Sequence, residues 1–135
     1  MEINEITNRV IGAAIRVHQG LGPGLLESVY EVVLGGELTR QGFLVERQKA
    51  VDFVFEGIRY EHGFVVDLLV HGTVVVELKS VEQLAQVHRK QLLTYLRLMN
   101  LNVGLLINFG GSTLKEGLVR IVNGPAPSVS PVSSV

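Results

Sequence analysis

Two carboxylates and a lysine lie inside two apolar runs near the middle of the chain, and together they could hold a metal ion and activate a water molecule. Asp67 lies in the first run, and Glu77 and Lys79 end the second. Runs of β-branched residues and leucines separated by a glycine-containing turn predict a hairpin of two buried strands. Ionised groups in such strands are costly to desolvate unless a partner or a metal compensates them. The two runs are Phe64–Val70 and Thr73–Lys79.

The register of this hairpin decides whether the charged groups share a face. Side chains alternate along a strand, so Glu77 and Lys79 point to the same side. A two-residue loop would place Asp67 opposite Val76 and turn it away from Glu77. A three-residue loop, His71-Gly72-Thr73, would place Asp67 directly opposite Glu77. We expect the odd-numbered loop because it gathers all three charges on one face.

Two carboxylates on adjacent strands suit a hard cation such as Mg2+, or Mn2+ in its place. Mg2+ takes oxygen ligands and is usually held by one or two carboxylates, several waters and a substrate phosphate. A lysine beside it can stabilise negative charge at phosphorus or help to position a water. The alternative is a structural ion pair in a covered sheet. Glu77 and Lys79 alone would favour that ion pair, whereas Asp67 at the matching parity leaves both interpretations open.

Polar residues on two predicted helices could lie near these groups. His88, Gln91 and Tyr95 are spaced i, i+3, i+7, so they lie on one side of a helix and could face a phosphate or a bound water. The alternative is that they are ordinary residues at the edge of the apolar face. On another helix, Glu27 falls in the first turn, where the helix dipole alone favours a carboxylate. Tyr30, one turn later, is typical of a core aromatic residue.

The composition narrows the class of protein. The chain has 135 residues, of which 47% are hydrophobic and 19% charged, so we expect one well-packed domain. It has no cysteine, which excludes disulfides, zinc thiolate sites and thiol catalysis. We expect a cytoplasmic protein without contact with a membrane, because the N-terminus does not resemble a signal peptide and no apolar run is long enough to span a bilayer. The net charge of −1 offers no global basic field for strong nucleic-acid binding.

The remaining pattern predicts a mixed α/β sandwich with helices on both faces of the sheet. A capping box at Ser80 to Gln83 predicts where the third helix begins. Within the second helix, Gly35-Gly36 predicts either close packing by another helix or a bend. Pro and Ser residues indicate a flexible tail over 124–135, which leaves 1–123 as the domain. The expected helices cover about 6–17, 25–41 and 81–100, and the expected extended segments cover 43–55, 58–61, 64–70, 73–79, 101–109 and 118–122.

The chain resembles a known family. The segment Gly24-Leu25-Leu26-Glu27-Ser28-Val29-Tyr30 matches the signature of the GxxExxY proteins, small bacterial and archaeal members of the PD-(D/E)XK nuclease superfamily. Several segments match in one order, so the resemblance covers nearly the whole chain apart from the tail. These further segments are Ile11-Gly12-Ala13-Ala14, Gly22-Pro23-Gly24, Asp67-Leu68-Leu69-Val70, Glu77-Leu78-Lys79, Gln91-Leu92-Leu93-Thr94-Tyr95-Leu96 and Gly104-Leu105-Leu106-Ile107-Asn108-Phe109.

The resemblance implies a restriction-endonuclease-like core, a central mixed β-sheet flanked by helices in the order α-α-β-β-β-α-β. It implies Mg2+-dependent (or Mn2+-dependent) hydrolysis of nucleic-acid phosphodiester bonds, which we interpret as DNA cleavage. The roles that it implies are Asp67 and Glu77 as metal ligands, Glu27 as the extra helical carboxylate of RecB-type members, Lys79 as the catalytic lysine, and Gln91 and Tyr95 as their Gln-x3-Tyr motif. Beside these, we keep His88 and Tyr30 as candidate accessory residues.

Two other classes of function compete with this interpretation. A nuclease-derived binding or regulatory module with weak or no turnover would act with a protein partner or as a homodimer, and the near-neutral net charge favours it. The intact set of Asp67, Glu77 and Lys79 favours the enzyme. A purely structural α/β protein would require all of these charges to be incidental, and we rank it last.

Overall fold

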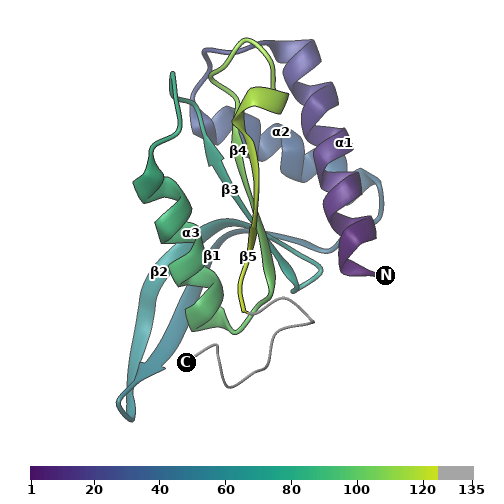
Figure 1. Ribbon diagram of the computed structural model, residues 1–135. Helices are drawn as coiled ribbons and strands as arrows, with labels where there is room; N and C mark the ends of the chain where they lie inside the picture. Colours follow the sequence, from purple (N-terminus) through teal and green to yellow (C-terminus); the bar gives the residue numbers. More distant parts are fainter. Residues whose placement is uncertain (125–135) are drawn as a thin grey trace.

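A five-stranded sheet in the order β1-β2-β3-β4-β5 forms the centre of the computed structural model, which describes residues 1–124 (Figure 1). Neighbouring strands are antiparallel except β3 and β4, which are parallel and are joined through helix α3. Beyond Gly124, the predicted tail lies outside the described residues. The elements are α1 (Ile3–Leu21), α2 (Glu27–Arg40), β1 (Val45–Phe55), β2 (Ile58–Val70), β3 (Val74–Lys79), α3 (Gln86–Met99), β4 (Val103–Asn108), the short 3-10 helix η1 (Lys115–Gly117) and β5 (Leu118–Val122).

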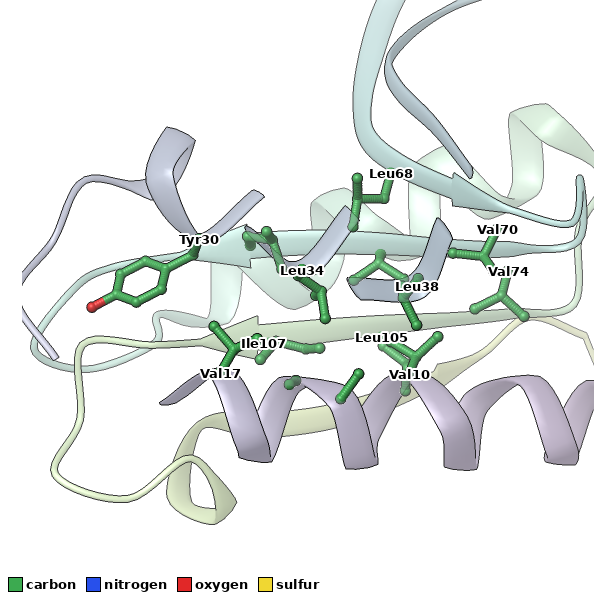
Figure 2. Close-up of a cluster of buried hydrophobic side chains, with 14 of the residues drawn as sticks. Val10, Val17, Tyr30, Leu34, Leu38, Leu68, Val70, Val74, Leu105 and Ile107 are labelled. Atoms are coloured by element: carbon green, nitrogen blue, oxygen red, sulfur yellow. The ribbon is translucent and has the colours of Figure 1, made fainter. Parts of the chain in front are cut away.

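Helices cover both faces of the sheet, as predicted. One core lies between the sheet and helices α1 and α2, and its side chains are drawn in Figure 2. A second core lies between the sheet and α3 and includes Leu92 and Leu96 of that helix. Strand β3 serves both cores, because Val76 belongs to the first and Val75 to the second. Its residues from Val74 to Leu78 are therefore all buried, which explains why the strand is apolar on both faces apart from the candidate site.

The predicted start of the third helix is wrong. Helix α3 begins at Gln86, five residues later than expected, and residues 81–83 form a bend. The Ser80 hydroxyl does not cap a helix, because it donates a hydrogen bond to the Leu25 carbonyl at 2.6 Å. Instead, His88 Nδ1 accepts the Ala85 N–H at 3.1 Å, which satisfies one of the free amides at the start of α3.

Neither of the two expected explanations for Gly35-Gly36, close packing by another helix or a bend, holds in the structure. A Cβ atom on Gly35 would lie 3.2 Å from Cδ of Arg47 and 3.6 Å from Cδ2 of Leu68. Close packing at this point therefore comes from the side chains of β1 and β2, not from another helix. The helix runs without interruption from Glu27 to Arg40. No helix within residues 1–124 is long and apolar enough to cross a membrane.

Strands β1 and β2 form a long hairpin that extends past the other strands (Figure 1). Its turn is Glu56-Gly57, as predicted, and both residues have positive φ, at 50° and 78°. Two consecutive positive φ angles are typical of a type I′ turn, whose twist matches that of paired strands. The expected short segment at 58–61 is the beginning of the continuous strand β2.

Candidate active site

The loop between β2 and β3 has three residues, so the expected odd-numbered loop is confirmed. Val70 pairs with Val74, and Leu68 pairs with Val76. His71 and Gly72 in the loop have φ of 52° and 66°. Continuing this register by one residue places Asp67 opposite Glu77.

The regular pairing of β2 with β3 ends at this point, and the two carboxylates replace it. The Asp67 N–H donates to Glu77 Oε2 at 2.7 Å, and the Leu78 N–H donates to Asp67 Oδ2 at 2.8 Å. Each carboxylate thus accepts a backbone amide of the opposite strand. Because the two amides belong to the backbone of paired strands, they fix the orientation of both carboxylates.

Strand β2 is irregular on its other side as well. Gln48, which lies opposite Asp67 in β1, has a φ of 49°, in the left-handed region that a residue other than glycine rarely adopts. Val66 and Leu68 have the same parity, yet Val66 packs in the core under α3 and Leu68 in the core under α1 and α2. The strand therefore changes face at Asp67. The carboxylate pair lies where the sheet divides into a β1–β2 part and a β3–β4–β5 part.

Burial and nearby negative charges raise the pKa values of both carboxylates. Glu77 is 6% exposed, and its burial, followed by the negative charge of Asp67, raises its pKa to about 8. Burial also raises the pKa of Asp67, and the charges of Glu31 and Glu27 add to that effect. The positive charge of Lys79 lowers the pKa of Glu77 in part. The positive charge of Lys79 therefore compensates the pair only in part.

The structural ion pair that we kept as an alternative is not present among residues 1–124. The ion pairs found there join other residues, and no carboxylate lies within 4.0 Å of the Lys79 amine. Lys79 is half-buried, two residues after Glu77 on the same strand, so alternation directs both to one face. Its amine is therefore close enough to influence Glu77 without being neutralised by it.

The donor set fits a hard cation. Glu77 Oε1 accepts no hydrogen bond from residues 1–124, and no buried side-chain oxygen there lacks a partner, so this oxygen is accessible to solvent. One or two carboxylates completed by water and phosphate are the usual ligands of Mg2+. The charge of Glu27 raises the pKa of both Asp67 and Glu77. The described residues nevertheless contain no group of three His, Asp or Glu side chains positioned to hold one metal ion, so the three-carboxylate set stays a prediction.

Three residues outside the predicted set surround Asp67: Glu31, Arg47 and Gln48. Glu31 is 5% exposed and forms an ion pair with Arg47, with 3.2 Å between Oε2 and Nη2. The Gln48 amide donates both to Glu31 and, at 3.3 Å, to Asp67 Oδ1. Glu31 lies four residues after Glu27, and this helical spacing could have indicated that both face the site. Nothing in the sequence marks Gln48, because its role depends on its unusual φ.

Tyr30 is a core residue that fixes the loop before α2. Its ring is fully buried and stacks on Phe109 with centroids 4.4 Å apart, and its hydroxyl points out of the core cluster in Figure 2. The hydroxyl donates to the Gly22 carbonyl and accepts the Leu25 N–H at 3.2 Å. These contacts position the chain that leads into Glu27.

Replacing Tyr30 with phenylalanine should lower the free energy of unfolding by about 1–2 kcal/mol, because it removes two part-buried hydrogen bonds, to the Gly22 carbonyl and from the Leu25 amide. Urea unfolding followed by circular dichroism measures this change. Tyr60→Phe is the matched control, since Tyr60 is 42% exposed, and it should change stability by less than about 0.5 kcal/mol. Equal stability of Tyr30→Phe and the wild type would show that the hydroxyl does not hold the loop.

Of the predicted row His88, Gln91 and Tyr95 on α3, only part lies close to the carboxylates. Burial raises the pKa of Tyr95, and the charges of Glu77 and Asp67 raise it further, which places its hydroxyl near the carboxylates. Gln91 is exposed one turn earlier. His88 uses Nδ1 to cap the helix, so its expected contact with a phosphate stays a prediction for its other ring nitrogen.

A hollow of about 640 Å3 lies beside the first turn of α2 and just after the end of β3. Glu27 faces this hollow from α2, and Ser80 faces it from the segment that follows Lys79. It can admit a ligand next to the carboxyl end of β3. The lining residues are Gly24, Leu25, Leu26, Glu27, Ser28, Ser80, Val81, Glu82 and Gly110.

Comparison with known families decides the classification. A model of the PD-(D/E)XK nuclease superfamily matches residues 4–121. The chain belongs to the PD-(D/E)XK nuclease superfamily. The mixed sheet flanked by helices is consistent with the restriction-endonuclease-like fold of PD-(D/E)XK proteins. PD-(D/E)XK nucleases generally use divalent metals such as Mg2+. No curated protein and no solved structure matches the chain significantly.

Proposed function

We propose that this protein is a divalent-metal-dependent nuclease that hydrolyses phosphodiester bonds in DNA. The observation that carries the proposal is the opposed pair of Asp67 and Glu77, two carboxylates with raised pKa values and no neutralising cation among residues 1–124. Carboxylates whose pKa values are shifted by burial and by a specific charged neighbour are candidate functional groups. The PD-(D/E)XK membership supports hydrolysis of a nucleic acid.

Asp67 and Glu77 would hold Mg2+ or Mn2+, and Glu27 at the edge of the hollow would be a further carboxylate ligand. When bound, the cation supplies charge that neutralises phosphoryl oxygens and lowers the pKa of a water. Glu77 must lose its proton to act as a ligand, so metal binding should release a proton. The amides of Asp67 and Leu78 keep both carboxylates oriented during this change.

Other side chains would act on the phosphate and the water. The Lys79 ammonium would stabilise the negative charge that develops at the phosphoryl group, or hold the attacking water in line. Tyr95, near the carboxylates, and Gln91, one turn away, would orient the same groups by hydrogen bonds. Tyr30 would act indirectly, by holding the loop that forms one wall of the hollow.

Incubation of the purified protein with single-stranded DNA, duplex DNA and RNA, each with Mg2+, Mn2+ or EDTA, tests the proposal. We expect DNA cleavage only with metal and loss of cleavage in Asp67→Asn, which removes a ligand charge and keeps the size of the side chain. Glu5→Gln is the control, because Glu5 is exposed near the start of α1, outside the candidate site. Cleavage that survives in Asp67→Asn would overturn the assignment. A wild type that cuts no substrate but binds a protein partner would support the regulatory module.

A further inference from the structure

One face of the projecting β1–β2 hairpin is made of apolar and aromatic side chains. Phe53 pairs with Tyr60, and Phe55 pairs with Ile58, so alternation places all four on the same face. Phe55 is 58% exposed, Ile58 57% and Tyr60 42%. Large exposed apolar patches on a folded protein mark surfaces that bind something. We refer to residues 53–60 as the arm.

Stacked rings connect the arm to the candidate active site. Tyr60 stacks on Phe53 with centroids 5.2 Å apart, and Phe53 lies 6.4 Å from Phe64. Phe64 in turn stacks on Tyr95 at 4.2 Å, with an interplanar angle of 10°. Tyr95 lies near the carboxylate pair. The exposed end of the arm and the site are therefore the two ends of one aromatic series whose rings are already ordered.

Glycine at position 63 allows this order. A Cβ atom on Gly63 would overlap the ring of Phe53, so any other residue would displace that ring. The rings are thus fixed by packing before any ligand arrives. Binding to a preformed surface loses little conformational entropy.

Helix α3, whose last turn lies beside β1 just before the arm, carries only positive charges. It contains Arg89, Lys90 and Arg97, and neither Asp nor Glu. No carboxylate within residues 1–124 forms an ion pair with any of the three. Lys90 and Arg97 are seven residues apart and lie on one side of the helix. The near-neutral net charge of the chain therefore conceals a local cationic ridge.

A hollow lies at the base of the arm, beside the last turn of α3. Its volume is about 490 Å3, and β1 and the last turn of α3 form its walls. It leaves space for a chain next to the base of the arm and the C-terminal end of α3. The lining residues are Lys49, Ala50, Val51, Asp52, His62, Leu98 and Met99.

We infer that the arm and helix α3 bind single-stranded nucleic acid, with unpaired bases stacked on Tyr60 and Phe55 and phosphates along Lys90 and Arg97. Cationic grooves combined with aromatic rings are the common chemistry of single-strand binding, because every base has a face that can stack. Bases inside a duplex are already stacked and cannot reach such rings. The inference rests on the proposed function in taking nucleic acid as the ligand, and it adds that the substrate is unpaired near the cut.

The charges favour this occupant over a second copy of the chain. A symmetric dimer through the arm would use the same surface on both subunits. It would bring a second cationic α3 towards the first, and like charges that face each other oppose association. A polyanion is attracted by the same ridge.

Binding in EDTA, measured by fluorescence anisotropy of labelled oligothymidylate, tests this inference without any cleavage. Tyr60→Ala and Phe55→Ala should each weaken binding about 5- to 100-fold. Val54→Ala is the matched control, because Val54 is 64% exposed on the opposite face of the arm, and it should leave the affinity unchanged. Replacing both Lys90 and Arg97 with glutamine should reduce the salt dependence of log Kd by about 1.4, whereas Arg40→Gln on α2 should not.

A second variant reports stacking directly. The chain has no tryptophan, so Tyr60→Trp introduces a single fluorophore into the arm. We expect its fluorescence to be quenched on addition of oligothymidylate, with affinity equal to or tighter than that of the wild type. Unchanged fluorescence at saturating oligonucleotide would overturn the stacking contact.

Single-strand binding by the arm and the proposed nuclease activity can be refuted independently. Unchanged affinity in both alanine variants of the arm, or tighter binding of duplex than of single strands, would overturn the inference and leave metal-dependent cleavage untouched. Arm-dependent binding in a protein that cuts nothing would contradict the proposed nuclease alone. A dimer detected by light scattering that dissociates in Phe55→Ala would assign the arm to a second copy and overturn the inference.

Discussion

Replacing Lys79 with alanine should slow metal-dependent DNA cleavage by about 100- to 1000-fold while the protein stays folded, because removing one group that stabilises transition-state charge costs about that much. Lys79 is half-buried at the end of β3 and forms no ion pair within residues 1–124, so its loss removes no structural bond. The Lys79 ammonium stabilises negative charge that develops in the transition state and not only the bound substrate, so its removal should lower kcat. Single-turnover cleavage at saturating protein measures it.

Two further variants separate charge from position. Lys79→Arg keeps a cation and should retain more activity than Lys79→Ala, although the guanidinium has a different shape. Lys115→Ala removes an exposed lysine in η1, outside the site, and should cut DNA like the wild type. An equal loss of activity in the alanine variants of Lys79 and Lys115 would mean that general charge, and not the lysine at β3, supports cleavage.

The register of the site could be predicted from the sequence because a strand pair offers only two parities. Side chains alternate with a period of two, and a loop of odd length is the one that places Asp67 opposite Glu77. The apolar faces of β3 likewise require cover on both sides, and helices were available to provide it. Such features follow from local periodicity, which a single sequence contains.

Other features of the fold and of the candidate site depend on contacts between segments that are distant in sequence. Ser80 has the pattern of a helix cap, yet its hydroxyl is used by the Leu25 carbonyl, 55 residues away, and the helix begins later. The change of face at Asp67 arises because its carboxylate and that of Glu77 replace strand hydrogen bonds. Gln48 adopts positive φ opposite this break and bridges Glu31 to Asp67. No local propensity encodes any of these contacts.

Replacing Glu77 with glutamine should make the metal-free protein more stable at pH 9 than the wild type, by an amount on the order of a few kcal/mol. Glutamine keeps the size of the side chain and can accept the Asp67 N–H through its carbonyl, so the structural hydrogen bond survives. What it removes is the cost of ionising a buried carboxylate next to Asp67. Urea unfolding in EDTA at several pH values measures the difference.

The sign of the pH dependence follows from the raised pKa. Glu77 has a pKa of about 8 in the folded protein, against 4.5 when it is unperturbed. Between these values the folded state holds a proton that the unfolded state has lost, so the wild type should lose stability as the pH rises from about 4.5 to about 8. Burial raises the pKa of Asp67 as well, which adds a change of the same sign. Glu77→Gln should therefore flatten this decline without removing it.

Metal should reverse the order of the two proteins. A cation that binds the folded state alone stabilises it by mass action, and it does so by replacing the proton on Glu77 with a compensating charge. Addition of Mg2+ or Mn2+ at pH 8 should raise the melting temperature of the wild type and leave that of Glu77→Gln nearly unchanged. Glu116→Gln, which removes an exposed carboxylate near η1, should respond like the wild type. If metal still raised the melting temperature of Glu77→Gln, the cation would bind elsewhere. The reason is that a neutral amide lacks the negative charge that a cation at this position requires.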